Sequence, residues 1–165
     1  VGINAPWNPI PRPVQPLPLD TPVYLQELAP LLTDLLGIEV TPSEVILNSV
    51  LKVDLENDGV DEVLLSATRS SAPTLPPAAA GDYSIVIVRK FINGQVENLI
   101  LQSDLYPEAV ELAYPFDYKV IGAYDLNGNG RLEVVTASTH YEGASATIFE
   151  IQSDGRLAKV LESSC

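Results

Sequence analysis

The chain contains an internal repeat, in which two similar segments lie 71 residues apart. The first reads SVLKVDLENDGVDEVLLSATRS from Ser49, and the second reads KVIGAYDLNGNGRLEVVTASTHY from Lys119. In both copies an apolar stretch leads into an acidic loop rich in Asn, Asp and Gly, and a β-branched stretch follows that loop. Such a period indicates that one small structural unit occurs twice.

Each copy continues with two more stretches that are typical of strands. These stretches are 83–92 and 95–102 in the first copy, and 145–152 and 157–163 in the second. Asn93-Gly94 and Asp154-Gly155 supply the turns between them. The sequence therefore predicts a mainly β fold with two repeated four-stranded antiparallel blade-like units.

The two units span residues 49–104 and 119–165 of a single β-domain, 49–165. Two units are too few to close a propeller ring, which needs four or more blades. We therefore expect the units to pack together face to face as a sandwich. The alternative is that subunits assemble to supply the missing neighbours.

Residues 1–22 form a Pro-rich arm with seven prolines. Proline removes the backbone donor and fixes the backbone dihedral angle φ, so we expect an extended arm without helix or central strand. One interpretation is a flexible spacer. The other is an arm that binds another subunit, with Trp7 and Ile10 as the partner-binding anchors.

Residues 23–48 contain a short helical segment that we expect to pack on the β-domain. Leucines recur at helical spacing up to Leu36, and Gly37 is a plausible end. Pro30 lies inside the pattern, so a kinked helix or two short helices are expected. Residues 41–44 resemble a capping box. Residues 70–81 and 105–117 are outside the repeat and are expected as surface loops, with a helical turn at 107–112.

The two acidic loops carry the residue types that calcium prefers. Calcium takes six to eight oxygen ligands, and a tight loop must converge them. Gly59 and Gly130 permit the bend. The predicted ligands are Asp54, Glu56, Asp58, the carbonyl of Val60 and Glu62 in the first loop, and Asp125, Asn127, Asn129, the carbonyl of Arg131 and Glu133 in the second.

The last acidic position separates two classes of calcium loop. In helix–loop–helix sites, position twelve is acidic and a helix follows. Here position twelve is Leu65 or Thr136, whereas position nine is Glu and a β-branched stretch follows. The motifs DLENDGVDE and DLNGNGRLE instead resemble the FG-GAP or VCBS-type repeats of integrin α-chain propellers and secreted bacterial proteins. That resemblance covers residues 49–165 and implies a calcium ion in the loop that joins the first two strands of each blade.

Charge predicts an order for the two sites. The first loop has four carboxylates, whereas the second has two and the nearby cation of Arg131. Because affinity rises with ligand charge, the first site is expected to bind calcium more tightly. We expect both ions to be structural, because carboxylates that converge without a cation repel one another. The alternative is that both loops are polar turns without a metal.

Composition limits the partners and the location. The net charge of −13 argues against nucleic acid, and no apolar run is long enough for a transmembrane segment. A chain that starts at Val1 and lacks methionine is expected to be a secreted, mature product, in the extracellular space or the cell envelope. Calcium is abundant there. Cys165, the single cysteine, is expected as a free thiol or an intermolecular disulfide.

Few residues suit catalysis. His140 is the only histidine, and a strand would place Ser138 on the same face, but no nucleophile elbow and no orienting acid accompany them. We therefore expect a non-catalytic calcium-binding protein, a structural or protein-binding subunit of an adhesion or filament assembly. The alternative is a carbohydrate or cell-wall ligand-binding module that uses Tyr114, Phe116, Tyr118 and Tyr124. A hydrolase that uses His140 is the remote alternative.

Overall fold

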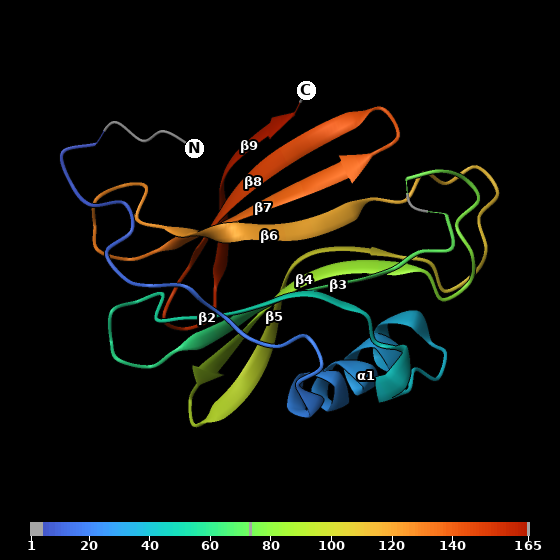
Figure 1. The fold of residues 1–165 in the computed structure, drawn as a ribbon, viewed down its shortest axis with the longest axis horizontal. Coiled ribbons are helices and arrows are strands. Elements are labelled where there is room, and N and C mark those ends of the chain that lie inside the picture. The colour runs from blue at the N-terminus through green and yellow to red at the C-terminus, as the bar shows by residue number, and fades with distance from the viewer. Residues whose placement is uncertain (1–4, 73, 165) are drawn as a thin grey trace.

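The computed structural model describes residues 5–72 and 74–164, which form two antiparallel sheets and one α-helix (Figure 1). The first sheet contains β1 (Gln15–Pro16), β2 (Leu47–Val53), β3 (Glu62–Arg69), β4 (Tyr83–Ile92) and β5 (Gln95–Leu105), in that order. The second contains β6 (Asp117–Tyr124), β7 (Glu133–His140), β8 (Gly143–Ile151) and β9 (Leu157–Ser164). The helix is α1 (Pro22–Leu36), and a 3-10 turn, η1 (Pro42–Glu44), follows it. Cys165 lies outside the described residues.

The predicted repeat is confirmed, because β2–β5 and β6–β9 are each a four-stranded antiparallel meander. The acidic loop follows the first strand in both copies, and the registers match there. Val53 pairs with Glu62 in one copy, and Tyr124 pairs with Glu133 in the other. Strand β5 continues three residues beyond the predicted end, because Leu105 still pairs with Tyr83.

The two sheets pack face to face, as predicted, around a shared apolar core. This core takes side chains from the inner faces of both sheets, and its fully buried members come mainly from β3, β4 and β7. Its residues are Val53, Leu55, Leu64, Val86, Val88, Leu101, Ala123, Leu132, Val134, Phe149 and Ile151.

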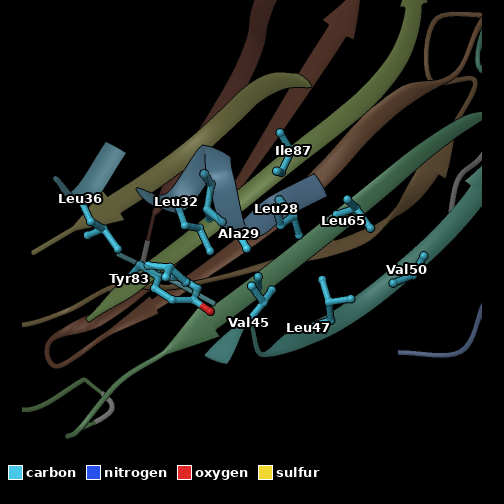
Figure 2. Packing of buried hydrophobic residues seen from close by; sticks show 13 residues of the cluster. Leu28, Ala29, Leu32, Leu36, Val45, Leu47, Val50, Leu65, Tyr83 and Ile87 are labelled. Atoms are coloured by element: carbon cyan, nitrogen blue, oxygen red, sulfur yellow. The ribbon is translucent and has the colours of Figure 1, made fainter. Parts of the chain in front are cut away.

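Helix α1 covers the opposite face of the first sheet, so β3 and β4 are buried on both sides. Figure 2 shows Leu28 and Leu32 of the helix directed at Leu65 and Ile87 of the sheet, and all four side chains are 0% exposed. The expected packing of the leucine face is confirmed. No helix in the described part of the chain is long and apolar enough to span a membrane.

Pro30 lies inside one uninterrupted helix, so the alternative of two short helices is wrong. Its ring is exposed, and the buried leucines lie on the other side of the helix and hold it to the sheet. Gly37 ends the helix as predicted, in the left-handed region with φ of 68°. The capping box of residues 41–44 is also present, and it starts the 3-10 turn η1.

The two segments outside the repeat pair with each other at the end of the molecule opposite the acidic loops (Figure 1). Val110 exchanges two backbone hydrogen bonds, of 2.9 and 3.1 Å, with Ala78. These bonds hold Val110 in an extended conformation. The predicted helical turn at 107–112 is therefore wrong.

The Pro-rich arm lies along its own chain. Strand β1 pairs with β2 through Gln15 and Pro16, and Leu17 donates a hydrogen bond of 2.8 Å to the carbonyl of Val50. The arm therefore adds an edge strand to the first sheet, which agrees with the exclusion of helix and central strand.

Candidate metal centre

The two acidic loops lie side by side at one end of the sandwich (Figure 1). Loop 1 comprises residues 54–61, between β2 and β3, and loop 2 comprises residues 125–132, between β6 and β7. The backbone N–H of Leu132 donates a hydrogen bond of 2.8 Å to the carbonyl of Leu55. This bond joins the two copies of the repeat directly.

The first aspartate of each loop organises its turn in the same way. Asp54 accepts hydrogen bonds from the N–H groups of Asn57 at 2.6 Å and Gly59 at 3.0 Å. Asp125 accepts equivalent bonds from Gly128 at 2.7 Å and Gly130 at 3.0 Å. Both carboxylates therefore face the inside of their loops, where a metal ligand must lie.

The two aspartates differ in what surrounds them. Burial raises the pKa of Asp54, but hydrogen bonds from the backbone of Gly59, Asn57 and Asp58 and the charge of Arg12 outweigh it, so the pKa lies below its ordinary value. Asp125 is more deeply buried, with 4% exposed.

The predicted last ligands, Glu62 and Glu133, close the loops from the first residue of the following strand. Glu62 accepts a hydrogen bond of 2.9 Å from the N–H of Leu55, and Glu133 accepts one of 2.7 Å from Leu126. Their exposed fractions are 1% and 2%. Each loop thus has a fixed carboxylate at both ends.

The predicted middle ligands lie nearer the surface. The side chains of Asp58 and Asn129 are exposed, and each accepts a hydrogen bond from the N–H two residues later. Asn127 is also exposed, and its amide nitrogen donates a bond of 2.8 Å to Glu133. Val60 is 45% exposed.

Two cations pair with Glu56 of loop 1 and with Glu62, which closes this loop. Glu56 and Glu62 both hold the ammonium group of Lys90, which comes from β4. The other carboxylate oxygen of Glu56 accepts a hydrogen bond of 2.6 Å from Arg131. Arg131 belongs to loop 2, but its side chain therefore binds a carboxylate of loop 1.

No side-chain cation pairs with Asp125 or Glu133 among the described residues. Burial, together with the negative charges of Asp125 and Glu150, raises the pKa of Glu133 above its ordinary value, although the hydrogen bond from Leu126 opposes the shift. Loop 2 therefore holds two buried carboxyl groups that no side-chain cation in the described part of the protein neutralises.

The residues of loop 2 fit a divalent cation better than those of loop 1. Within the described ranges no three His, Cys, Asp or Glu side chains are gathered as a complete metal shell. Calcium accepts amide and carbonyl oxygens as well, and the oxygens of Asn127 and Asn129 each keep a second lone pair. With Asp125, Glu133 and the carbonyl of Arg131, they would hold the ion.

Sequence reasoning missed the residues that distinguish the two loops. Lys90 follows Arg89 near the end of a mostly apolar strand, YSIVIVRKFI, and this charge within the strand was its only signal. Glu150 occupies the same place in the second copy, and Arg12 lies in the Pro-rich arm. Neither residue had a signal in the sequence.

The predicted anchors of the arm lie in different surroundings. Trp7 packs on loop 2 of its own chain, and its indole N–H donates a hydrogen bond of 2.9 Å to the carbonyl of Asp125. Ile10 is 55% exposed and lines a groove of about 330 Å³ with Leu51 and Tyr124. Ile10 therefore remains available to a partner, whereas Trp7 has an intramolecular contact.

The hydrolase residues are not arranged as a pair. The hydroxyl of Ser138 forms a hydrogen bond of 2.7 Å with Ser145. The ring of His140 packs on Phe116, with centroids 4.8 Å apart, and its buried Nδ1 has no hydrogen-bond partner in the described structure. Nothing here orients the imidazole toward the serine.

The aromatic residues divide into separate groups. Phe116 and Tyr118 stack with centroids 5.6 Å apart, and Tyr114 contacts Tyr141 at 4.9 Å. Tyr124 lies apart from them, in the groove beside Ile10. The cluster of Tyr114, Phe116, Tyr118 and Tyr124 is thus divided, and the exposed pair is Tyr114 with Tyr141, which are 43% and 58% exposed.

No family model, curated protein or solved structure matches the chain. The resemblance of the loops to FG-GAP or VCBS-type repeats therefore stays a prediction.

Proposed function

We propose that this protein is a non-catalytic, calcium-stabilised β-sandwich that acts as a structural or protein-binding subunit of an extracellular or envelope assembly. Loop 2 is the principal calcium site. Its ligands are Asp125, Asn127, Asn129, Glu133 and the backbone carbonyl of Arg131.

One observation carries the calcium part. Asp125 and Glu133 are 4% and 2% exposed, and no side-chain cation among the described residues pairs with either. Burying a charge without a counter-charge is costly even when it is hydrogen-bonded, so a bound divalent cation would offset part of that cost. Amide and carbonyl oxygens nearby suit calcium, a hard ion, better than a soft metal.

The position of loop 2 indicates what the ion would do. The loop joins β6 to β7, and its backbone also bonds to loop 1 through Leu132 and Leu55. A cation that fixes loop 2 would therefore stabilise the contact between the two sheets. This role is structural, since calcium would support the fold and take no part in a reaction.

The experiment is a calcium titration of metal-free protein followed through Trp7. The indole contacts loop 2 and is the only tryptophan, so its fluorescence reports on this loop. Terbium, a calcium substitute, should show luminescence sensitised by the same ring. At a calcium concentration about 100-fold above Kd, the free energy of unfolding should rise by about 2.7 kcal/mol.

Two variants make this test specific. Glu133→Gln should abolish both signals, because it removes a buried ligand charge. Asp154→Asn is the matched control, since Asp154 is exposed and pairs only with Arg156. A melting temperature and a Trp7 spectrum that do not respond to calcium would refute the calcium part.

The assembly part is supported by exposed apolar surface on the arm and at one sheet edge. Ile10 borders the groove beside Leu51, and the outer strand β9 exposes Val160 and Leu161 by 57% and 56%. Native mass measurement of wild type, Ile10→Asp and Val160→Asp, with and without chelator, tests this part. We expect an oligomer that at least one variant dissociates, and a monomer at all concentrations would contradict it.

A carbohydrate-binding module is the second candidate function, and the exposed pair of Tyr114 and Tyr141 favours it. Tyrosine rings at a surface can stack on sugar rings, and the centroids of these two rings lie 4.9 Å apart. A glycan array of wild type and Tyr141→Ala tests it. Binding that the variant loses would support this function, and an array without any binding would exclude it.

A further inference from the structure

Lys90 is buried where a metal ion would otherwise neutralise loop 1. Its side chain is 3% exposed, and its ammonium group lies 2.8 Å from a carboxylate oxygen of Glu62. It also contacts Glu56, whose side chain is 7% exposed. Two of the predicted calcium ligands are therefore directed at an amino group of the protein itself.

The second cation completes this arrangement. Glu56 gives one oxygen to Lys90 and the other to Arg131, whose guanidinium also donates a hydrogen bond of 2.6 Å to the carbonyl of Ile151. Both oxygens of Glu56 are thus occupied. Glu62 is equally committed, because it binds Lys90 with one oxygen and the N–H of Leu55 with the other.

The ammonium group is suited to remain in this place. It donates hydrogen bonds to both Glu56 and Glu62. Lys90 and Glu62 lie on adjacent strands and are 3% and 1% exposed, so a Lys90 side chain turned to solvent would leave Glu62 buried without a cation.

The second copy of the repeat lacks this lysine. Val63 pairs with Arg89 in the first sheet, and Val134 pairs with Phe149 in the second. One residue further along each ladder, Lys90 comes opposite Glu62, and Glu150 comes opposite Glu133. The same structural position therefore holds a cation in the first copy and a carboxylate in the second.

We propose that Lys90 is a built-in cation that replaces the metal in loop 1, so that only loop 2 takes calcium. The part of this inference that concerns loop 2 rests on the proposed function. The part that concerns loop 1 does not, because Glu56 and Glu62 are already paired without a metal. The inference reverses the order of affinity that the number of carboxylates predicts. A count of carboxylates ignores the cations that the fold brings to them.

A metal count by native mass spectrometry tests this inference. We expect one bound calcium in the wild type, none in Glu133→Gln and two in Lys90→Met, since the last variant removes the ammonium group that occupies one oxygen each of Glu56 and Glu62. Two ions in the wild type, or no additional ion in Lys90→Met, would overturn the role of Lys90. No ion in the wild type would refute the calcium site of loop 2, and Lys90→Met would still decide about loop 1 by gaining an ion or not.

A second pair of variants keeps the test decisive if Lys90→Met does not fold. Asp58 and Asn129 occupy equivalent exposed positions, and each accepts only a local backbone hydrogen bond. Asn129→Asp should tighten calcium binding several-fold, whereas Asp58→Asn should leave the calcium Kd within twofold of wild type. If Asp58→Asn weakens binding tenfold, loop 1 holds the metal and the inference is wrong.

Discussion

Arg12 donates a hydrogen bond of 2.9 Å to the carbonyl of Gly130, which lies 118 residues further along the chain. The same guanidinium donates bonds of 2.6 and 3.1 Å to the carbonyls of Asp54 and Leu55. One side chain of the Pro-rich arm therefore joins loop 1 to loop 2. The arm is part of the folded unit, whether or not it also contacts a partner.

Arg12→Ala should destabilise the protein. The substitution leaves three partly buried carbonyls without their charged donor, which costs about 1–3 kcal/mol. Urea unfolding measures the loss. Arg156→Ala is the matched control, because that side chain is 81% exposed and pairs only with Asp154. Equal stability of the Arg12 and Arg156 variants would show that the arm adds nothing to the fold.

Gly128→Ala should be more damaging than Gly59→Ala. Both glycines have positive φ, 80° and 84°, so either substitution costs roughly 1–2 kcal/mol of backbone strain. At position 128, the new Cβ would also lie 2.9 Å from the ring of Trp7, whereas nothing lies within 4 Å at position 59.

Trp7 itself provides the measurement for this pair. We expect the fluorescence emission of Gly128→Ala to shift to longer wavelength as the indole moves into water, while Gly59→Ala keeps the wild-type spectrum. Identical spectra and identical unfolding midpoints in both variants would show that Trp7 does not pack on loop 2 in solution.

Local patterns were sufficient to predict most of the fold. The repeat, the hairpin turns and the β-branched stretches predicted both meanders, and the leucine spacing predicted the helix. Apart from the repeat, whose copies lie 71 residues apart, each of these signals lies within one element or turn. Pro30 was over-interpreted, because the packing of Leu28 and Leu32 on the sheet outweighs the loss of one helical hydrogen bond.

The ligand positions of the loops were predictable for the same reason, but their charge balance was not. Lys90 reaches Glu62 across 28 residues, and Arg131 reaches Glu56 across 75. Such contacts depend on strand register and on how the sheets pack. A local motif carries no information about register or sheet packing. It therefore predicts which carboxylates lie together and not which cation pairs with them.

Pro30→Ala should stabilise the protein. Alanine restores a backbone donor in the interior of α1, where proline is about 3 kcal/mol less favourable. Greater freedom of the unfolded chain offsets about 0.4–1 kcal/mol of this gain. We expect a net increase of about 1–3 kcal/mol in the free energy of unfolding by urea. Asp34→Ala, at another exposed position of the helix, is the control and should change it little. A loss of stability in Pro30→Ala would show that the helix needs the shape that proline imposes.

Tyr106 should make the protein sensitive to alkaline pH. Burial, together with the charge of Asp104 and a hydrogen bond of 3.0 Å to it, raises the pKa of Tyr106 from 10.0 to about 12. The folded state thus favours the neutral phenol, so its contribution to stability is complete below pH 10 and is lost as the pH rises toward 12. Between about pH 10 and 12, the free energy of unfolding should fall more steeply in the wild type than in Tyr106→Phe. Tyr141→Phe, at an exposed ring, should keep the wild-type slope, and the same slope in Tyr106→Phe would contradict this assignment.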